Sequence, residues 1–176
     1  MELLECRLSV DDLDAFLETI GTIADQHQVT IQAFDARYVA DRTHIERALC
    51  FADRAIDRGE NVARDRAVEI LLYAAGRRQI DRALEMGVAE GEHNAVVLVD
   101  ADPASDDERT PDGRESGALK DLLALESVVG RERTLESPDT EVLRNFFDVP
   151  DAEVAATDAS LADLVCERVA LLEVEK

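Results

Sequence analysis

The pattern of apolar and polar positions along the chain predicts three strands. Residues 2–8 form a short apolar run, and residues 29–34 (VTIQAF) alternate between apolar and polar side chains, several of them branched. Residues 95–100 (AVVLVD) give the clearest strand signal, because this run is almost wholly apolar. Such a run is typical of a strand that is buried on both faces.

Helical spacing appears in the segments between these strands. Ser9 and Asp12 form a capping pattern, which apolar residues follow at helical spacing, at positions 13, 16, 17, 20 and 24. Thr43 and Glu46 form a second capping box, and the helix it opens is predicted to end at Gly59.

The next predicted helix, over residues 62–75, contains the most apolar segment of the chain. Asn61 is its predicted N-cap, and its second half (ILLYAA) is apolar nearly all round, which predicts a place in the centre of the core. Gly76 is the predicted stop. A shorter helix is expected over residues 78–86, before Gly87.

The second half of the chain opens with a segment typical of a mobile acidic loop. Residues 100–117 (DADPASDDERTPDGRESG) contain seven acids, two prolines and two glycines. Three helices are predicted after this segment, over 118–127, from Ser137-Pro138 onward, and over 161–174. In the second of them, the side chains expected to face inward are Val142, Leu143, Phe146 and Phe147. The last of the three helices ends in VALLEV, which fits a helix or a strand. With no internal repeat and no linker, the pattern predicts one α+β domain over residues 1–176, a small β-sheet packed with several α-helices.

The chain is strongly acidic. The chain has 40 acids and 19 basic residues, a formal charge of −21, and only two of the basic residues are lysines. The acids are spread over amphipathic segments instead of forming a tail. This pattern suits a globular protein kept soluble in concentrated salt by a hydrated acidic surface, and the scarcity of lysine favours that interpretation over an ordinary acidic protein.

The basic residues are concentrated in one window. Residues 36–87 contain ten arginines and nine acids, so this window carries a net charge of +1. Arg77 and Arg78 follow a predicted helix end, where cations stabilise the helix dipole. Dipole stabilisation alone explains two arginines, whereas the whole window suits a site for a polyanion, because guanidinium groups bind phosphate at two points and stack on bases.

Catalytic chemistry is not indicated. The sequence has no glycine-rich phosphate loop, GxSxG, HExxH or CxxC motif, so no enzyme activity and no cofactor are predicted. Cys6, Cys50 and Cys166 are interpreted as reduced thiols packed as small hydrophobic groups, and no Cys/His spacing resembles a metal site. The acidic N-terminus does not resemble a signal peptide and no apolar run is long enough to span a membrane, so a cytoplasmic protein is expected.

Two titratable residues allow alternatives. His44 lies in the first turn of a predicted helix, either as a general base or as a partly exposed helix-start residue. Glu69 lies in the apolar helix, where a carboxylate must be paired or protonated. The expected partner is Arg66 or another arginine.

An ordered set of short features resembles a known family. They are Asp35-Ala36, His44-Ile45, EILLY at 69–73, Gly76, RQI at 78–80, Ala83 with Gly87, and the ending LVCERVALLEV. Together they resemble the small kinase-binding subunit of the KEOPS complex, the PRPK-binding protein family, and the acidic composition suggests a haloarchaeal member. The resemblance implies a non-catalytic accessory subunit in the threonylcarbamoyladenosine modification of tRNA. It would bind the kinase-like ATPase subunit and recruit tRNA through its single-stranded 3′ CCA end.

The resemblance gives the arginine window an expected role. Residues at the ends of adjoining predicted helices are expected to converge on RNA, and they are Asn61, Arg64, Arg77, Arg78 and Gln79. The kinase surface is expected on the C-terminal segment or on the 137–147 helix, although their apolar faces also fit a core. Two alternatives remain: a protein-only adaptor that regulates the kinase without touching RNA, and a small-molecule enzyme with a pocket lined by Glu69 and His44.

Overall fold

The computed structural model describes residues 1–103, 105 and 107–174 and confirms the α+β class. Four strands form one antiparallel sheet, in the order β2-β3-β1-β4. The described chain forms two compact units: Met1–Asp35 with Val88–Thr134, and Ala36–Gly87 with the segment from Leu135 onward. No helix in the described ranges combines the length and the apolar character needed to cross a bilayer.

The first unit contains the sheet, and its strands largely follow the predictions. β1 (Glu2–Val10), β2 (Val29–Asp35) and β3 (Gly91–Ala101) lie where they were expected, and β3 pairs with both of the others. Residues on both faces of β3 are buried from Ala95 to Val99, as its apolar run predicted. The edge strand β4 (Val128–Arg131) was not predicted, because it is only four residues long and contains a glycine.

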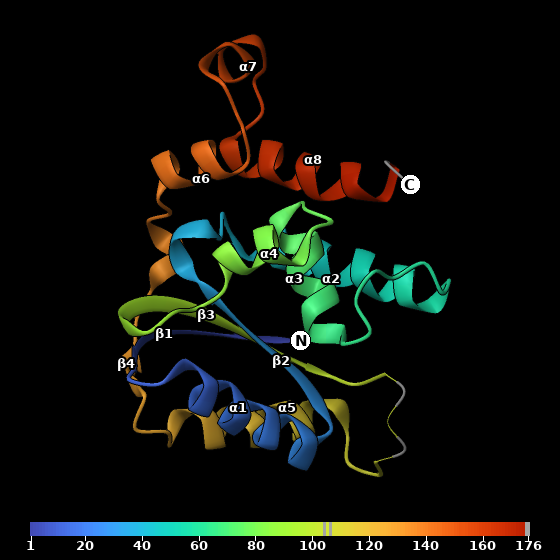
Figure 1. The fold of residues 1–176 in the computed structure, drawn as a ribbon, viewed down its shortest axis with the longest axis vertical. Helices are drawn as coiled ribbons and strands as arrows, with labels where there is room; N and C mark the ends of the chain where they lie inside the picture. The colour runs from blue at the N-terminus through green and yellow to red at the C-terminus, as the bar shows by residue number, and fades with distance from the viewer. Residues whose placement is uncertain (104, 106, 175–176) are drawn as a thin grey trace. The chain divides into compact units, whose positions relative to one another are not determined.

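Two helices cover one face of this sheet. Figure 1 shows α1 (Leu13–His27) and α5 (Pro111–Leu123) side by side, and they bury Phe16, Ile20 and Leu122 against alternate residues of the strands. The N-cap of α1 is Asp12, whose side chain accepts from the Ala15 N–H at 3.0 Å, whereas Ser9 lies in β1.

The acidic segment 100–117 is not a loop throughout. The Thr110 hydroxyl accepts from the Gly113 N–H, and Pro111 occupies the first turn, so α5 begins at residue 111 instead of 118. Residues 100 and 101 still belong to β3. Ala104 and Asp106 lie outside the described residues.

The second unit is helical. The helices in order are α2 (Arg42–Asp57), α3 (Arg66–Ala75), α4 (Ile80–Ala83), α6 (Thr140–Phe146), α7 (Asp151–Ala156) and α8 (Leu161–Val174). Helix α2 packs against α3 and α8. Because α8 is helical up to residue 174, the segment VALLEV forms a helix and not a strand. Helix α7 was not predicted, and the helix expected over 78–86 is α4 followed by a 3-10 turn.

Aspartates cap three of these helices in place of the predicted residues. Asp41 accepts from the His44 N–H at 2.8 Å, Asp65 from the Val68 N–H and Asp139 from the Val142 N–H. Helix α3 therefore begins at residue 66 instead of 62, and α6 begins at 140. Aspartate is as strong an N-cap as serine or asparagine, so a local pattern alone does not rank these neighbours.

Cys6 and Cys166 are buried thiols, as predicted, but Cys50 on α2 is exposed. Helix α2 presents its alanine-rich side, including Ala48, Ala52 and Ala55, to the core, and Cys50 lies off that side.

Candidate functional site

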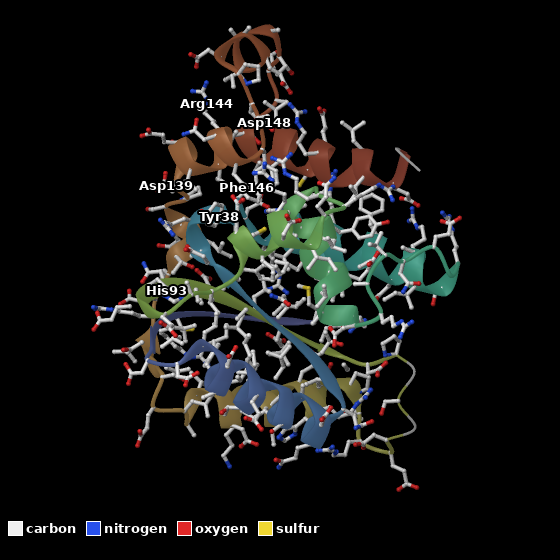
Figure 2. The ribbon with its side chains drawn as sticks, in the orientation of Figure 1. Tyr38, His93, Asp139, Arg144, Phe146 and Asp148 are labelled. Atoms are coloured by element: carbon white, nitrogen blue, oxygen red, sulfur yellow. The ribbon has the colours of Figure 1, made fainter. Side chains whose placement is uncertain are left out.

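The candidate site is a hollow of about 460 Å³ in the second unit. Its lining residues come from the turn after α3, from α4 with its 3-10 extension, and from the end of α6: Arg77, Gln79, Arg82, Glu85, Asn145, Phe146 and Asp148. Two arginines, two side-chain amides and an aromatic ring thus share one concave surface, part of which is labelled in Figure 2.

The end of α3 places Arg77 in this hollow. Gly76 adopts a left-handed conformation (φ +60°), and the Arg77 N–H donates to the Leu72 carbonyl at 3.0 Å, which turns the chain sharply. The Arg77 guanidinium then donates to the Phe146 carbonyl and to the Asp148 carboxylate, at 3.2 Å from the latter, and lies 5.5 Å from the centre of the Phe146 ring. Arg77 therefore holds the end of α6 as well as facing the hollow.

Aromatic rings lie beside the arginines. The Tyr38 and Phe146 rings meet edge to face, with 4.9 Å between their centres, and Phe146 contacts Phe147 in the same way at 5.0 Å. Tyr38 and Phe146 are half-buried, and the Arg37 guanidinium lies 5.6 Å from the Tyr38 ring centre. Half-exposed rings next to guanidinium groups suit ligands that offer both a planar face and a negative charge.

Carboxylates partly neutralise this surface. Asp148 pairs with Arg77, and Glu85 lies 3.6 Å from Arg82. Elsewhere in the arginine window, Arg54 and Arg58 pair with Glu173, and Arg66 pairs with Asp53 at 2.7 Å. Several arginines of the window are thus ion-paired, and a polyanion must compete with carboxylates for these arginines.

The structure brings together only some of the five residues predicted for RNA. Arg77 and Gln79 line the same hollow. Arg78 is half-buried and donates to the Leu172 carbonyl of α8 at 2.7 Å. Asn61 and Arg64 lie in the loop before α3.

The two loop residues differ in their contacts. The Asn61 side chain donates to the Ala63 carbonyl at 2.7 Å. Arg64 is exposed and makes no hydrogen bond or ion pair with any residue that the structure describes. Neither is among the residues that line the hollow around Arg77.

His44 has a structural role that neither sequence alternative described. Its side chain is fully buried, with 0% exposure, instead of partly exposed. Nδ1 lies 3.2 Å from the Ala40 N–H and Nε2 lies 2.8 Å from the Ala74 carbonyl, so the partners assign the proton to Nε2. Burial lowers the pKa of His44 to about 4, and no substrate can reach it for proton transfer.

Glu69 does not form the predicted ion pair with an arginine. Its Oε2 atom accepts from the backbone N–H groups of Val62 and Ala63, at 3.0 and 2.8 Å, and the residue is 2% exposed. Arg66, the expected partner, pairs with Asp53 on α2 instead. The carboxylate therefore fixes the loop before α3.

Sequence reasoning missed several residues of the hollow. Arg82 and Asn145 line it beside Arg77, and Phe146, predicted to face inward, is half-buried there. The contact between Arg77 and Phe146 spans 69 residues, and no local pattern signals it.

Comparison with known proteins identifies the family. A search among curated proteins found no match to this chain. The family model described as kinase binding protein CGI-121 matches residues 9–173, which is nearly the whole chain. This agrees with the resemblance that EILLY, RQI and the C-terminal segment indicated. The chain therefore belongs to the CGI-121 family of kinase-binding proteins, the family of the small, non-catalytic KEOPS subunit.

Proposed function

We propose that this KEOPS accessory subunit also recruits tRNA for threonylcarbamoyladenosine modification in the cytoplasm, and that the hollow around Arg77 takes the single-stranded 3′ CCA end. The observation that carries the proposal is the meeting of Arg77 and Gln79 with Phe146 in one concave surface beside Tyr38. Arg77 and Gln79 are also among the residues that the sequence pattern predicts for RNA, from their place after the apolar helix.

The side chains present match what an unpaired RNA strand offers. Half-exposed aromatic rings stack on bases, guanidinium groups bind phosphate, and amides such as Gln79 and Asn145 both donate to and accept from base edges. Backbone phosphates and splayed bases of a single-stranded end are therefore the expected ligand groups.

High salt favours this kind of site over diffuse attraction. At molar salt the Debye length is about 3 Å, so only charges in contact attract each other effectively. Single-strand affinity also falls with a log–log slope of about −0.7 for each phosphate neutralised. A halophilic protein, as the composition suggests, would need stacking and oriented hydrogen bonds, which a hollow with fixed side chains supplies.

The test measures binding of full-length tRNA and of tRNA lacking its 3′ terminal nucleotides. We expect Phe146→Leu to weaken binding of the full-length tRNA about fivefold or more, because stacking of one base contributes about 1–3 kcal/mol. Arg77→Gln should weaken it as well, because the guanidinium that would bind phosphate is lost. Arg64→Gln is the matched control for the loss of one arginine, since Arg64 lies outside the hollow. Equal binding of both tRNAs, or unchanged binding by the Arg77 and Phe146 variants with intact folds, would overturn the proposal.

The ion pairs of the arginine window favour a second candidate, a protein-only adaptor. Arg54, Arg58 and Arg66 already face carboxylates, as Arg77 does, which leaves less free positive charge for RNA than the sequence indicated. Stimulation of the kinase's ATPase activity that persists fully without any tRNA binding would support this candidate.

We further propose that the C-terminal helix contributes to kinase binding. Helix α8 buries Leu164, Val165 and Val169, so most of its apolar face is core, but Leu171 is 46% exposed. Leu171→Glu is expected to reduce capture of the kinase while leaving tRNA binding unchanged. Unchanged capture would remove this helix face from the kinase surface.

A further inference from the structure

Asp148 occupies an unusual position at the mouth of the hollow. Its side chain is 77% exposed, yet its Oδ2 atom pairs with the Arg77 guanidinium at 3.2 Å. Its backbone is in the left-handed region (φ +52°), which aspartate adopts more readily than most residues but at a cost in energy. Arg77 also donates to the Phe146 carbonyl, so the guanidinium stays in place whether or not the carboxylate does.

The carboxylate presents to Arg77 the same kind of group that a phosphodiester presents. Both are anionic oxygens that accept charge-assisted hydrogen bonds from the guanidinium fork. An ion pair this exposed contributes little to stability, so another anion can replace the carboxylate at little cost in free energy.

We propose that Asp148 holds the phosphate position on Arg77 in the RNA-free protein and is displaced when an RNA phosphate binds. This inference rests on the proposed function of the hollow. Asp148 is then an autoinhibitory contact. A free anion gains little by replacing the carboxylate, whereas an RNA end that also stacks on Phe146 gains enough to displace it. Asp148 thereby raises the preference of the site for RNA over small anions.

The direct test compares Asp148→Asn with Asp151→Asn. Asparagine is nearly isosteric with aspartate and tolerates the left-handed backbone, so the first variant keeps the local fold. Asp151 pairs with Arg144 and lies three residues away outside the hollow, so its replacement removes the same charge without freeing Arg77. We expect Asp148→Asn to bind the tRNA 3′ end about twofold to fivefold more tightly, the range that exposed ion pairs cover, and Asp151→Asn to bind like the unaltered protein.

Two further measurements test whether Asp148 acts through Arg77. In the background of Arg77→Gln, the effect of Asp148→Asn should disappear, because there is no guanidinium left to free. Inorganic phosphate should compete with tRNA more effectively in Asp148→Asn than in the unaltered protein, since a small anion then meets no competing carboxylate at Arg77.

The outcomes separate this inference from the proposed function. Equal tightening by Asp148→Asn and Asp151→Asn would show a general charge effect and overturn the inference while leaving the RNA site in place. Binding that appears only in Asp148→Asn would support it. The absence of tRNA binding in every variant would overturn both the inference and the proposed function.

Discussion

The Nε2 atom of His44, in the first turn of α2, lies 2.8 Å from the carbonyl oxygen of Ala74, in the last turn of α3. Carbonyl groups in a last helical turn have no partner within the helix, and a buried one must find another donor. The imidazole supplies that donor, and its other nitrogen accepts from the Ala40 N–H. One neutral side chain thus joins two helices and the segment before α2.

This arrangement predicts a loss of stability in mild acid. Because burial lowers the pKa of His44 from 6.5 to about 4, the unfolded chain binds more protons than the folded chain between these values. The contribution of neutral His44 to the free energy of unfolding is therefore complete above about pH 6.5. It is lost as the pH falls towards 4, by an amount on the order of 3 kcal/mol. Urea unfolding at a series of pH values measures this slope.

His44→Gln provides the control for that slope. An amide also donates and accepts but does not titrate, so the variant should lose a large part of the decrease between pH 6.5 and 4. The same slope in both proteins would mean that carboxylates, and not His44, cause the acid sensitivity.

Glu69 is expected to act as a hydrogen-bond acceptor and not as the partner of an arginine. Glu69→Ala leaves the N–H groups of Val62 and Ala63 without their acceptor and should lower the free energy of unfolding by about 2–5 kcal/mol. Glu69→Gln retains an acceptor oxygen and should cost about 1 kcal/mol. Chemical unfolding distinguishes the two cases, and equal losses in both variants would indicate that the charge itself is what matters.

Two glycines should respond to alanine in opposite directions. Gly76→Ala forces a left-handed backbone on a residue with a side chain and should cost about 1–2 kcal/mol. Gly21 lies within α1, with nothing near its would-be Cβ atom, so Gly21→Ala should stabilise the protein by about 0.5–1 kcal/mol. Thermal unfolding checks both, and a stabilising Gly76→Ala would contradict the role of Gly76 in turning the chain after α3.

The three cysteines should differ in reactivity towards a thiol reagent such as dithionitrobenzoate. Burial raises the pKa of Cys6 to about 11 and also raises that of Cys166, while Cys50 is exposed. Because the thiolate is the reactive form, one thiol per chain should react quickly under native conditions and the other two only on unfolding. Cys50→Ser should abolish the fast phase, and rapid reaction of two or three thiols would contradict the described burial.

The elements that sequence reasoning located correctly have strong local signals of their own. β1 and β3 contain apolar runs, β2 alternates between apolar and polar residues, and α2 and α8 have apolar residues at helical spacing. The predicted limits of these elements lie close to the observed ones, except that β3 begins at Gly91, four residues before its apolar run. Helix α5 begins at residue 111 and not at 118, because Thr110 caps it and Pro111 fits its first turn, although the acids, prolines and glycines of 100–117 are typical of a loop. β4 and α7 are too short for a period to develop.

The sequence predicts only the part of the candidate site that lies in the arginine-rich window. Arg77 and Gln79 stand out because they follow a glycine-terminated apolar helix. Their neighbours Phe146 and Asp148 come from α6 and the residues just after it, and only tertiary structure brings them to Arg77. Ion pairs such as Arg66–Asp53 and Arg58–Glu173 also depend on which helices pack, so counting charges along the chain overestimated the free positive charge.

The strand order also constrains how the chain folds. β1 and β2 are synthesised first, but neither pairs with the other, and both pair with β3. At ribosomal rates, roughly 3–13 seconds separate the end of β2 from the end of β3. The sheet therefore forms only after the arginine-rich segment has been made. We expect its rate of assembly to depend on closure of that long loop more than on the fast formation of helices.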